Sequence, residues 1–289
     1  MVLRHRDAPT VPVLLSTFLL GVFLAAGPLA AGAQALSESE EDGSPTALSV
    51  GNLSTDFTFG GSGENAGVYN YNTNSQALMI SGSNGSLLVD YASSLDTGGF
   101  DRDTRRTIGA EALFGGNATL FDDFLRLPLS IYVPIRVNLD YRYVQPQNPD
   151  LTNLHRGAGG LGAGGGAELQ LPVGPDFIKD NLFVRGSAVL VPAVATSLGG
   201  NDADEIVNDD PSIETSRTRM RRMLNINLEA LFTELLGEST GVMAGYTFRA
   251  YGRSQQEPSS VGDVIDAATL EGDYRETSVQ HMIRIGLSW

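Results

Sequence analysis

The stretch that decides the fold is Leu127 to Val144, which reads LPLSIYVPIRVNLDYRYV. From Leu127 to Tyr143 every second residue is apolar or aromatic, and the residues between them are largely polar. A period of two is the pattern of a β-strand whose faces meet different environments. Strands of soluble proteins average about 5 or 6 residues, whereas a strand that crosses a bilayer needs about 9 to 11. Because this alternation lasts about 17 residues, it favours a transmembrane strand.

Two prolines and two tyrosines add detail to this stretch. Pro128 and Pro134 are unusual in a long strand, and they indicate a bulge or the start of the strand. Tyr141 and Tyr143, at the other end, match the aromatic girdle that barrels place at a membrane interface.

The alternation recurs through the rest of the chain. It is visible in 108–114, 161–171, 182–194, 220–232 and 242–250, and weaker signals lie in 53–59, 77–80 and 87–91. With the C-terminal residues, these segments predict an all-β fold, a transmembrane antiparallel up-and-down β-barrel of about ten strands. Eight and twelve strands are the alternatives, because the segment 60–75 is ambiguous. An even count is expected, since closure leaves no unpaired strand edge in lipid.

The spacing of the segments predicts which end of the barrel each connection occupies. Such barrels have short periplasmic turns and longer external loops. Counting back from the C-terminus places turns at 81–85, 115–124, 173–180 and 234–239, and loops at 96–103, 145–155, 199–216 and 253–276. The long acidic stretches then all fall on the external side, and both ends of the barrel chain are periplasmic.

The N-terminal residues are typical of an export signal. Arg4, His5 and Arg6 precede an apolar run from Val11 to Ala26, and small residues at Ala31, Ala33 and Ala35 offer cleavage sites. We therefore predict a signal peptide at 1–35, a flexible acidic segment at 36–47 and the barrel at 48–289. A retained membrane anchor is the alternative for the first segment.

The last residues, VQHMIRIGLSW, carry the most specific pattern. Ile283, Ile285, Leu287 and Trp289 alternate with polar or small residues, and the chain ends on an aromatic residue. This resembles the C-terminal signal strand of bacterial outer-membrane β-barrels, a superfamily rather than one subfamily. The resemblance implies an outer-membrane location, with outer-membrane lipids and the barrel-insertion machinery as partners. His281 departs from the apolar pattern and is expected at the interface.

Composition excludes several classes of function. The chain has no Cys, so thiolate metal sites and disulfide frameworks are excluded. Its formal net charge of −15 becomes −16 once Arg4, Arg6 and Asp7 are removed with the signal, and Lys179 is its only lysine. Such a charge argues against nucleic-acid binding. An acidic surface suits a salt-rich environment, and acidic loops that bind divalent cations are the alternative.

If the apolar face points to lipid, a set of charged residues must line the lumen. They are Glu111, Arg136, Asp140, Arg142, Glu168, Arg185, Arg221, Glu229, Arg249 and Arg284. Opposite charges in so narrow an interior are expected to pair, because isolated buried charges cost several kcal/mol. The set is therefore either a lattice that fills the lumen or the wall of a narrow charged passage.

No catalytic, cofactor or metal site is predicted. After the signal only His155 and His281 remain, and neither has the spacing to a nucleophile or carboxylate that barrel hydrolases use. The glycine run from Gly157 to Gly166 does not open a helix after a strand, which argues against nucleotide binding. We expect these glycines to let bulky lumen side chains pack against the wall.

The resulting functional hypothesis is an integral outer-membrane β-barrel, either structural or a narrow passive channel for ions and small solutes. The alternative is a surface-interaction protein with a closed lumen, whose acidic external loops bind a partner or divalent cations. A soluble periplasmic β-sandwich is the alternative outside the membrane.

Overall fold

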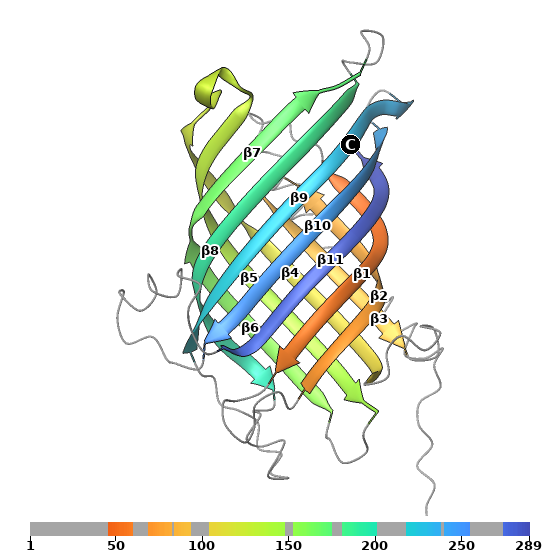
Figure 1. Ribbon diagram of the computed structural model, residues 1–289, viewed down its shortest axis with the longest axis vertical. Coiled ribbons are helices and arrows are strands. Elements are labelled where there is room, and N and C mark those ends of the chain that lie inside the picture. Colours follow the sequence, from red (N-terminus) through yellow and green to blue (C-terminus); the bar gives the residue numbers. More distant parts are fainter. Residues whose placement is uncertain are drawn as a thin grey trace, which may run out of the picture. The chain divides into compact units, whose positions relative to one another are not determined.

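The computed structural model describes residues 46–59, 69–82, 84–93, 104–147, 153–174, 181–200, 218–237, 240–254 and 274–289. These residues are almost entirely β-strand (Figure 1). The elements in chain order are β1 (Ala47–Phe59), β2 (Tyr69–Gly82), β3 (Gly85–Ser93), β4 (Thr104–Phe121), the short 3-10 helix η2 (Phe124–Arg126), β5 (Leu129–Pro146), β6 (Leu154–Ala163), β7 (Gly165–Pro172), β8 (Leu182–Gly200), β9 (Thr218–Gly237), β10 (Thr240–Ser254) and β11 (Tyr274–Ser288). None of the described helices is long and apolar enough to cross a membrane.

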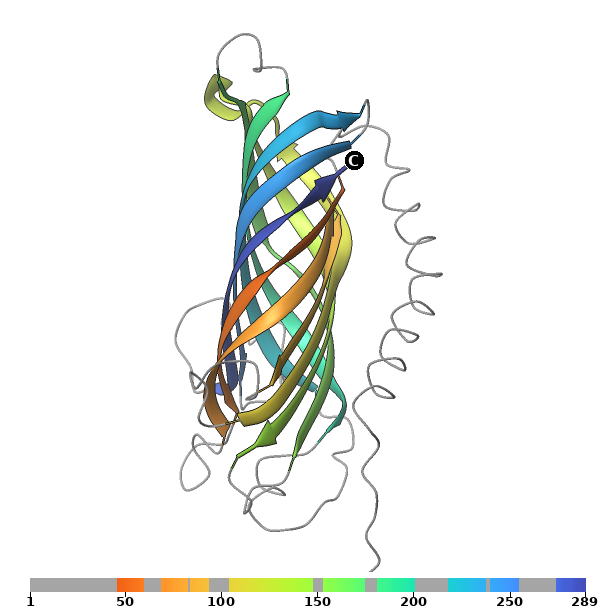
Figure 2. The ribbon, with the colours of Figure 1, turned by 90° about the vertical axis from the view of Figure 1, so that its right-hand side faces the viewer.

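The strands form one closed antiparallel barrel (Figures 1 and 2). With β6 and β7 taken together, each strand pairs with its neighbours in sequence. β1 pairs with β11 from Ala47 opposite Ser288 to Phe59 opposite Glu276, which closes the ring. β6 and β7 are two parts of one barrel strand, because both pair with β5 and with β8. The barrel therefore has ten strands, as predicted, and the two-sheet sandwich is wrong.

The break between β6 and β7 lies at Gly164. Its N–H donates to the Pro134 carbonyl at 3.1 Å, so the two strand parts stay continuous across it. A Cβ at this position would lie only 1.8 Å from the Leu190 carbonyl oxygen, so no larger residue fits without moving the backbone. Pro134 is inside β5 rather than at its start, whereas Pro128 directly precedes the strand.

The two ends of the barrel differ in their connections. At one end, which we call the turn end, lie the first residues of β1 and the last residues of β11. The strands that meet at this end are joined by the short connections 83–84, 122–128, 173–181 and 238–239. At the opposite end, which we call the loop end, the strands are joined by the connections 60–68, 94–103, 147–153, 201–217 and 255–273. The predicted turn at 115–124 is wrong in part, because Gly115 to Phe121 continue β4 and pair with Arg136 to Ile131 of β5. The predicted signal peptide, acidic segment and most loop residues lie outside the described residues.

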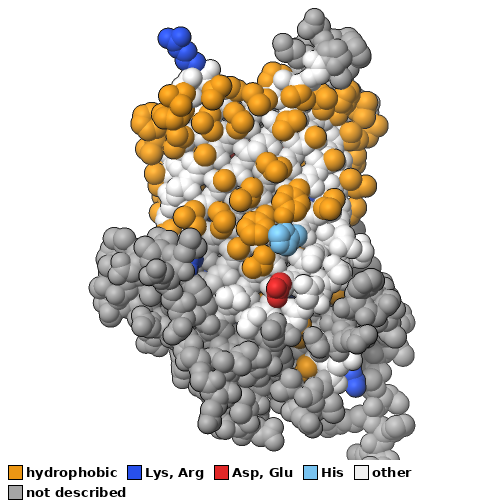
Figure 3. All heavy atoms as spheres, viewed as in Figure 1, with side chains coloured by type: hydrophobic (Ala, Val, Ile, Leu, Met, Phe, Trp, Pro, Cys, Tyr) orange, Lys and Arg blue, Asp and Glu red, His pale blue; other side chains and the backbone are white. Residues whose placement is uncertain are grey.

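Side chains alternate between the outside and the interior of the barrel. Along β5, Ile135, Leu139 and Tyr141 are exposed on the outside, and Arg136 and Asp140 are buried inside. Apolar side chains gather in a band on the part of the outer surface toward the turn end (Figure 3). The alternation predicted from sequence for β5 is therefore the one that the fold adopts.

The outer face of β1 and β2 changes character toward the loop end. There Leu53 and Phe57 are buried inside, while Asn52, Asp56 and Asn74 are exposed outside. β2 is also much longer than the short strand predicted at 77–80. Its outward-facing Asn72, Asn74 and Gln76 lack the apolar alternation by which the other strands were found.

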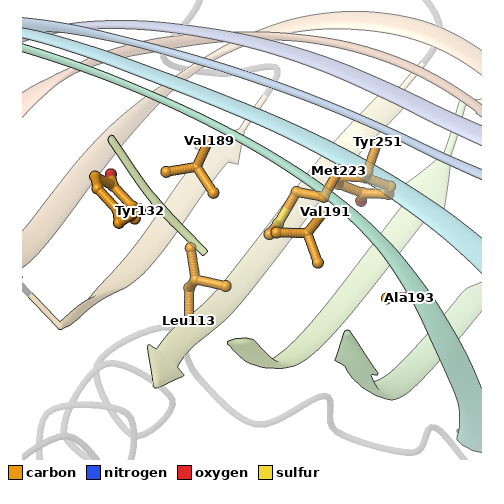
Figure 4. Packing of buried hydrophobic residues seen from close by; sticks show 7 residues of the cluster. All are labelled: Leu113, Tyr132, Val189, Val191, Ala193, Met223 and Tyr251. Carbon is orange, nitrogen blue, oxygen red and sulfur yellow. The ribbon is translucent and has the colours of Figure 1, made fainter. Parts of the chain in front are cut away.

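Apolar side chains fill part of the interior. Leu113, Tyr132, Val189, Val191, Ala193, Met223 and Tyr251 form one buried cluster (Figure 4). Its members come from β4, β5, β8, β9 and β10, so the cluster joins several parts of the wall. The interior is thus packed in part rather than being a uniform polar tube.

Candidate functional site: the charge network of the lumen

The structure places nine of the ten predicted lumen side chains among its buried residues. These are Glu111, Arg136, Asp140, Arg142, Arg185, Arg221, Glu229, Arg249 and Arg284. Glu168 is half-buried, and its pairing with Ser130 and Ser187 puts it on the inward face of β7. Charged side chains that point into a closed barrel can reach across the lumen. An ion pair between strands on opposite sides therefore marks a place where side chains block the lumen.

One ion pair joins opposite sides of the barrel. Arg249 Nη1 lies 3.5 Å from Glu111 Oε2. β10 and β4, which carry these residues, are five steps apart in either direction around a ring of ten strands. Asn138 on β5 donates to Glu111 Oε1 at 3.4 Å, and Arg249 donates to the Ser86 hydroxyl at 2.7 Å. The Glu111–Arg249 pair therefore spans the lumen, and Asn138 and Ser86 hold its two partners.

Two further pairs extend this layer. Arg221 Nη1 lies 2.5 Å from Asp140 Oδ1, and its guanidinium stands 4.1 Å above the centre of the Tyr251 ring. Arg142 Nη1 lies 3.1 Å from Asp90 Oδ2. Both carboxylates are buried, so each arginine has a compensating charge within the interior. Asp90 was not among the predicted lumen residues, although it alternates with Val89 and Tyr91 of β3.

A second layer lies toward the loop end. Glu276 Oε2 accepts from Arg156 Nε at 2.9 Å, and Arg253 Nη1 lies 3.5 Å from the same oxygen. Arg156 is on β6 and Glu276 on β11, four steps apart in the ring, so this pair also crosses the lumen. Sequence analysis missed all three residues because it ended the strands too early, with 253–276 taken as a loop.

Toward the turn end, Glu229 pairs with two arginines, Arg185 and Arg284. Its Oε2 lies 2.5 Å from Arg185 Nη2, and its Oε1 accepts from Arg284 Nη2. Arg284 also donates to the hydroxyls of Thr247 at 3.1 Å and of Ser49 and Ser81 at 3.2 Å. One carboxylate therefore holds two buried arginines.

Arg136 differs from the other lumen arginines. It donates to the Gly116 carbonyl at 2.7 Å and to Asn117 Oδ1 at 2.5 Å. Its contacts in the described part of the chain are with neutral oxygens and include no carboxylate. The structure therefore places Arg136 in the interior but outside the ion-paired set.

One side of the lumen toward the loop end carries buried polar groups of a different kind. Within the described residues, the side-chain oxygens of Thr55, Tyr71, Thr73 and Ser278 and both polar atoms of Gln280 have no protein hydrogen-bond partner. Buried polar atoms usually have a partner, either protein or water. This strip, on β1, β2 and β11, is therefore suited to contact with water.

The two histidines lie on the outside of the barrel. Tyr246 Oη is 2.6 Å from His281 Nδ1, and Tyr141 Oη is 3.3 Å from His155 Nδ1. Phe248 also packs against His281, with ring centres 5.0 Å apart, and Tyr143 against His155 at 4.9 Å. Both histidines are thus parts of exposed aromatic clusters.

The residues of the predicted insertion signal lie along the outer face of β11. Ile283, Ile285, Leu287 and Trp289 are 72%, 65%, 43% and 54% exposed, in strict alternation with inward-facing residues. Among the described residues, no three His, Asp or Glu side chains are placed to hold a metal ion.

The chain was also compared with known proteins. No model of a protein family matches it. No curated protein matches its sequence either.

Proposed function

We propose that this chain is an integral outer-membrane β-barrel whose lumen is closed at mid-height, so that its role is structural. The observation that carries the proposal is the division of side chains between the two faces of the wall. Exposed isoleucines, leucines and valines cover the outside, and arginine–carboxylate pairs fill the inside. An outer apolar band around a polar interior is the arrangement that a barrel needs in lipid.

Closure of the lumen rests on the Glu111–Arg249 pair. Side chains from strands on opposite sides meet there, and the apolar cluster that contains Val191, Met223 and Tyr251 occupies neighbouring space. Buried pairs in an environment of low polarity are held tightly once both charges are also hydrogen-bonded. We propose no catalytic role for the described histidines, because both lie on the outer surface beside aromatic residues.

A narrow passive channel for ions and small solutes is the second candidate. It is favoured by the strip of unpartnered polar atoms at Thr55, Tyr71, Thr73, Ser278 and Gln280, which would line a water-filled path. A surface-interaction role for the external loops is compatible with a closed lumen, and it concerns residues outside the described ranges.

Single-channel conductance of the detergent-purified mature protein in a planar bilayer tests the proposal. We expect a silent, heat-modifiable barrel, and discrete conductance steps in the double variant E111S/R249S, which removes the pair that crosses the lumen. The matched control is Glu234→Ser, an exposed carboxylate on β9, and should stay silent. Steps in the unmodified protein whose ion selectivity changes on Glu111→Gln would instead establish the channel.

A further inference from the structure

The turn end of the lumen contains a cavity of about 60 Å³ that is partly open to solvent. Its lining is largely polar and includes Tyr132, Arg136, Glu168, Arg185, Asn225 and Glu229. Because one water molecule needs about 10–15 Å³ of such space, the cavity suits only a small polar solute. The cavity lies on the turn-end side of the Glu111–Arg249 pair, so it does not depend on an open lumen.

The charged side chains that line this cavity are Arg136 and Arg185 and the carboxylates of Glu168 and Glu229. The carboxylate of Glu229 is shared, because it pairs with Arg185 and also with Arg284. Within the described residues, Arg136 donates to neutral oxygens and forms no ion pair with a carboxylate. Arg136 is 5% exposed, and a buried cation without a counter-charge is costly. An anion bound beside Arg136 would supply the missing charge.

Asn225 supplies a second and independent observation. Its side chain is 7% exposed and lines the cavity, and its Oδ1 has no hydrogen-bond partner within the described residues. An amide oxygen can only accept a hydrogen bond. A solute that satisfies it must present an O–H or N–H donor, such as a hydroxyl or an ammonium group.

We propose that this cavity is a binding site for small organic carboxylates that also carry a hydroxyl or ammonium group. The carboxylate pairs with Arg136, and the donor group bonds to Asn225 Oδ1. Pairing with a guanidinium in a site largely shielded from water is stronger than the same contact at a surface. The site goes beyond the structural role proposed above.

Isothermal titration calorimetry on the mature barrel in detergent tests the site, with three probes of similar size. Glycerate carries both groups, propionate lacks the hydroxyls and glycerol lacks the charge. We expect glycerate to bind most tightly, propionate more weakly and glycerol not at all. Arg136→Gln should weaken glycerate binding at least tenfold, while Arg126→Gln, which removes an exposed arginine of η2 at the same end, should leave it unchanged.

Asn225→Ala gives a second readout that general damage to the barrel would not reproduce. It should weaken glycerate binding and leave propionate binding unchanged, so that the preference between the two probes disappears. Heat-modifiable migration verifies that each variant is folded, and Arg136→Lys should retain more binding than Arg136→Gln. Equal effects of Arg136→Gln and Arg126→Gln, or binding of glycerol as tight as that of glycerate, would overturn the site. Because titration in detergent requires neither a bilayer nor conduction, its failure is distinct from failure of the structural proposal.

Discussion

At the scale of single residues, the interior depends on places where a side chain is absent. Gly109 on β4 is the sharpest case, because a Cβ built there would lie 2.0 Å from Asp90 Oδ1 and 2.7 Å from Arg142 Nη1. The buried Asp90–Arg142 pair therefore occupies the space that any other residue at position 109 would need. Gly166 plays the same role for the Tyr132 ring, whose Cε2 would lie 2.3 Å from an added Cβ.

Gly109→Ala should therefore destabilise the barrel by about 3 kcal/mol, because displacing one partner leaves a buried charge uncompensated. Gly116→Ala on the same strand is the matched control, since an added Cβ would meet nothing within 4 Å. Gly116→Ala should change the free energy of unfolding by less than about 1 kcal/mol. Urea-induced unfolding of the refolded barrel in detergent measures both values. Equal losses would show that Asp90 and Arg142 can move apart at little cost.

Glu229 gives a second residue-scale prediction. Glu229→Ala removes the carboxylate that pairs with both Arg185 and Arg284, so two buried arginines lose this partner. We expect a loss of about 3–5 kcal/mol in the free energy of unfolding. Glu234→Ala, on the exposed part of the same strand, should change it by less than about 0.5 kcal/mol. The same urea titration measures both variants. A Glu229→Ala variant as stable as the unmodified barrel would contradict the pairing of Glu229 with Arg185 and Arg284.

At the scale of strands, the alternation of residues predicted the strands whose outer face is apolar and whose inner face is charged. β5 is the clearest example, because its outward Ile135 and Leu139 and its inward Arg136 and Asp140 differ so strongly in polarity. The same reasoning failed for β2, where outward Asn72 and Asn74 alternate with inward Tyr71 and Thr73. When the outward and inward residues of a strand are both polar, the sequence shows no alternation of polarity by which the strand could be predicted.

The candidate site was predictable to the extent that strand ends were predictable. Arg221 and Arg249 fall within strongly alternating segments, so sequence parity alone assigned them to the lumen. Arg156 and Glu276 lie near strand ends, beyond the last clear apolar residue, and were missed. Which arginine meets which carboxylate depends on strand register and barrel closure, and neither follows from the pattern of one strand.

β11 carries a prediction that concerns assembly rather than stability. Trp289→Ala should lower the amount of barrel assembled in the outer membrane several-fold, because it removes the terminal aromatic residue that we expect the insertion machinery to read. Trp289→Phe should assemble normally, and refolding of Trp289→Ala into detergent without any machinery should be nearly unaffected. Heat-modifiable migration of isolated membranes compares the variants. Normal assembly of the Trp289→Ala variant would contradict the expectation that Trp289 is part of the insertion signal.

At the scale of the whole molecule, the barrel is longer than a bilayer requires. With β6 and β7 counted as one, its strands run from 9 residues in β3 to 20 in β9, and crossing a bilayer takes about 9 to 11. The apolar band occupies the part toward the turn end (Figure 3), while the outer face of β1 and β2 near the loop end is polar. These observations suit a barrel whose loop end extends beyond the hydrocarbon into water.

Lysine substitutions on the outer face test this placement. Ile283→Lys puts a charge at a 72% exposed position of the apolar band, and should cost about 2–4 kcal/mol when the barrel is folded in lipid vesicles. Asn74→Lys puts the same charge on the polar outer face of β2 and should cost less than about 0.5 kcal/mol. In a water-soluble barrel both positions would face solvent and tolerate lysine equally. Unfolding of the two variants in vesicles therefore separates the alternatives: unequal costs place the band in hydrocarbon, and equal small costs would contradict a membrane location.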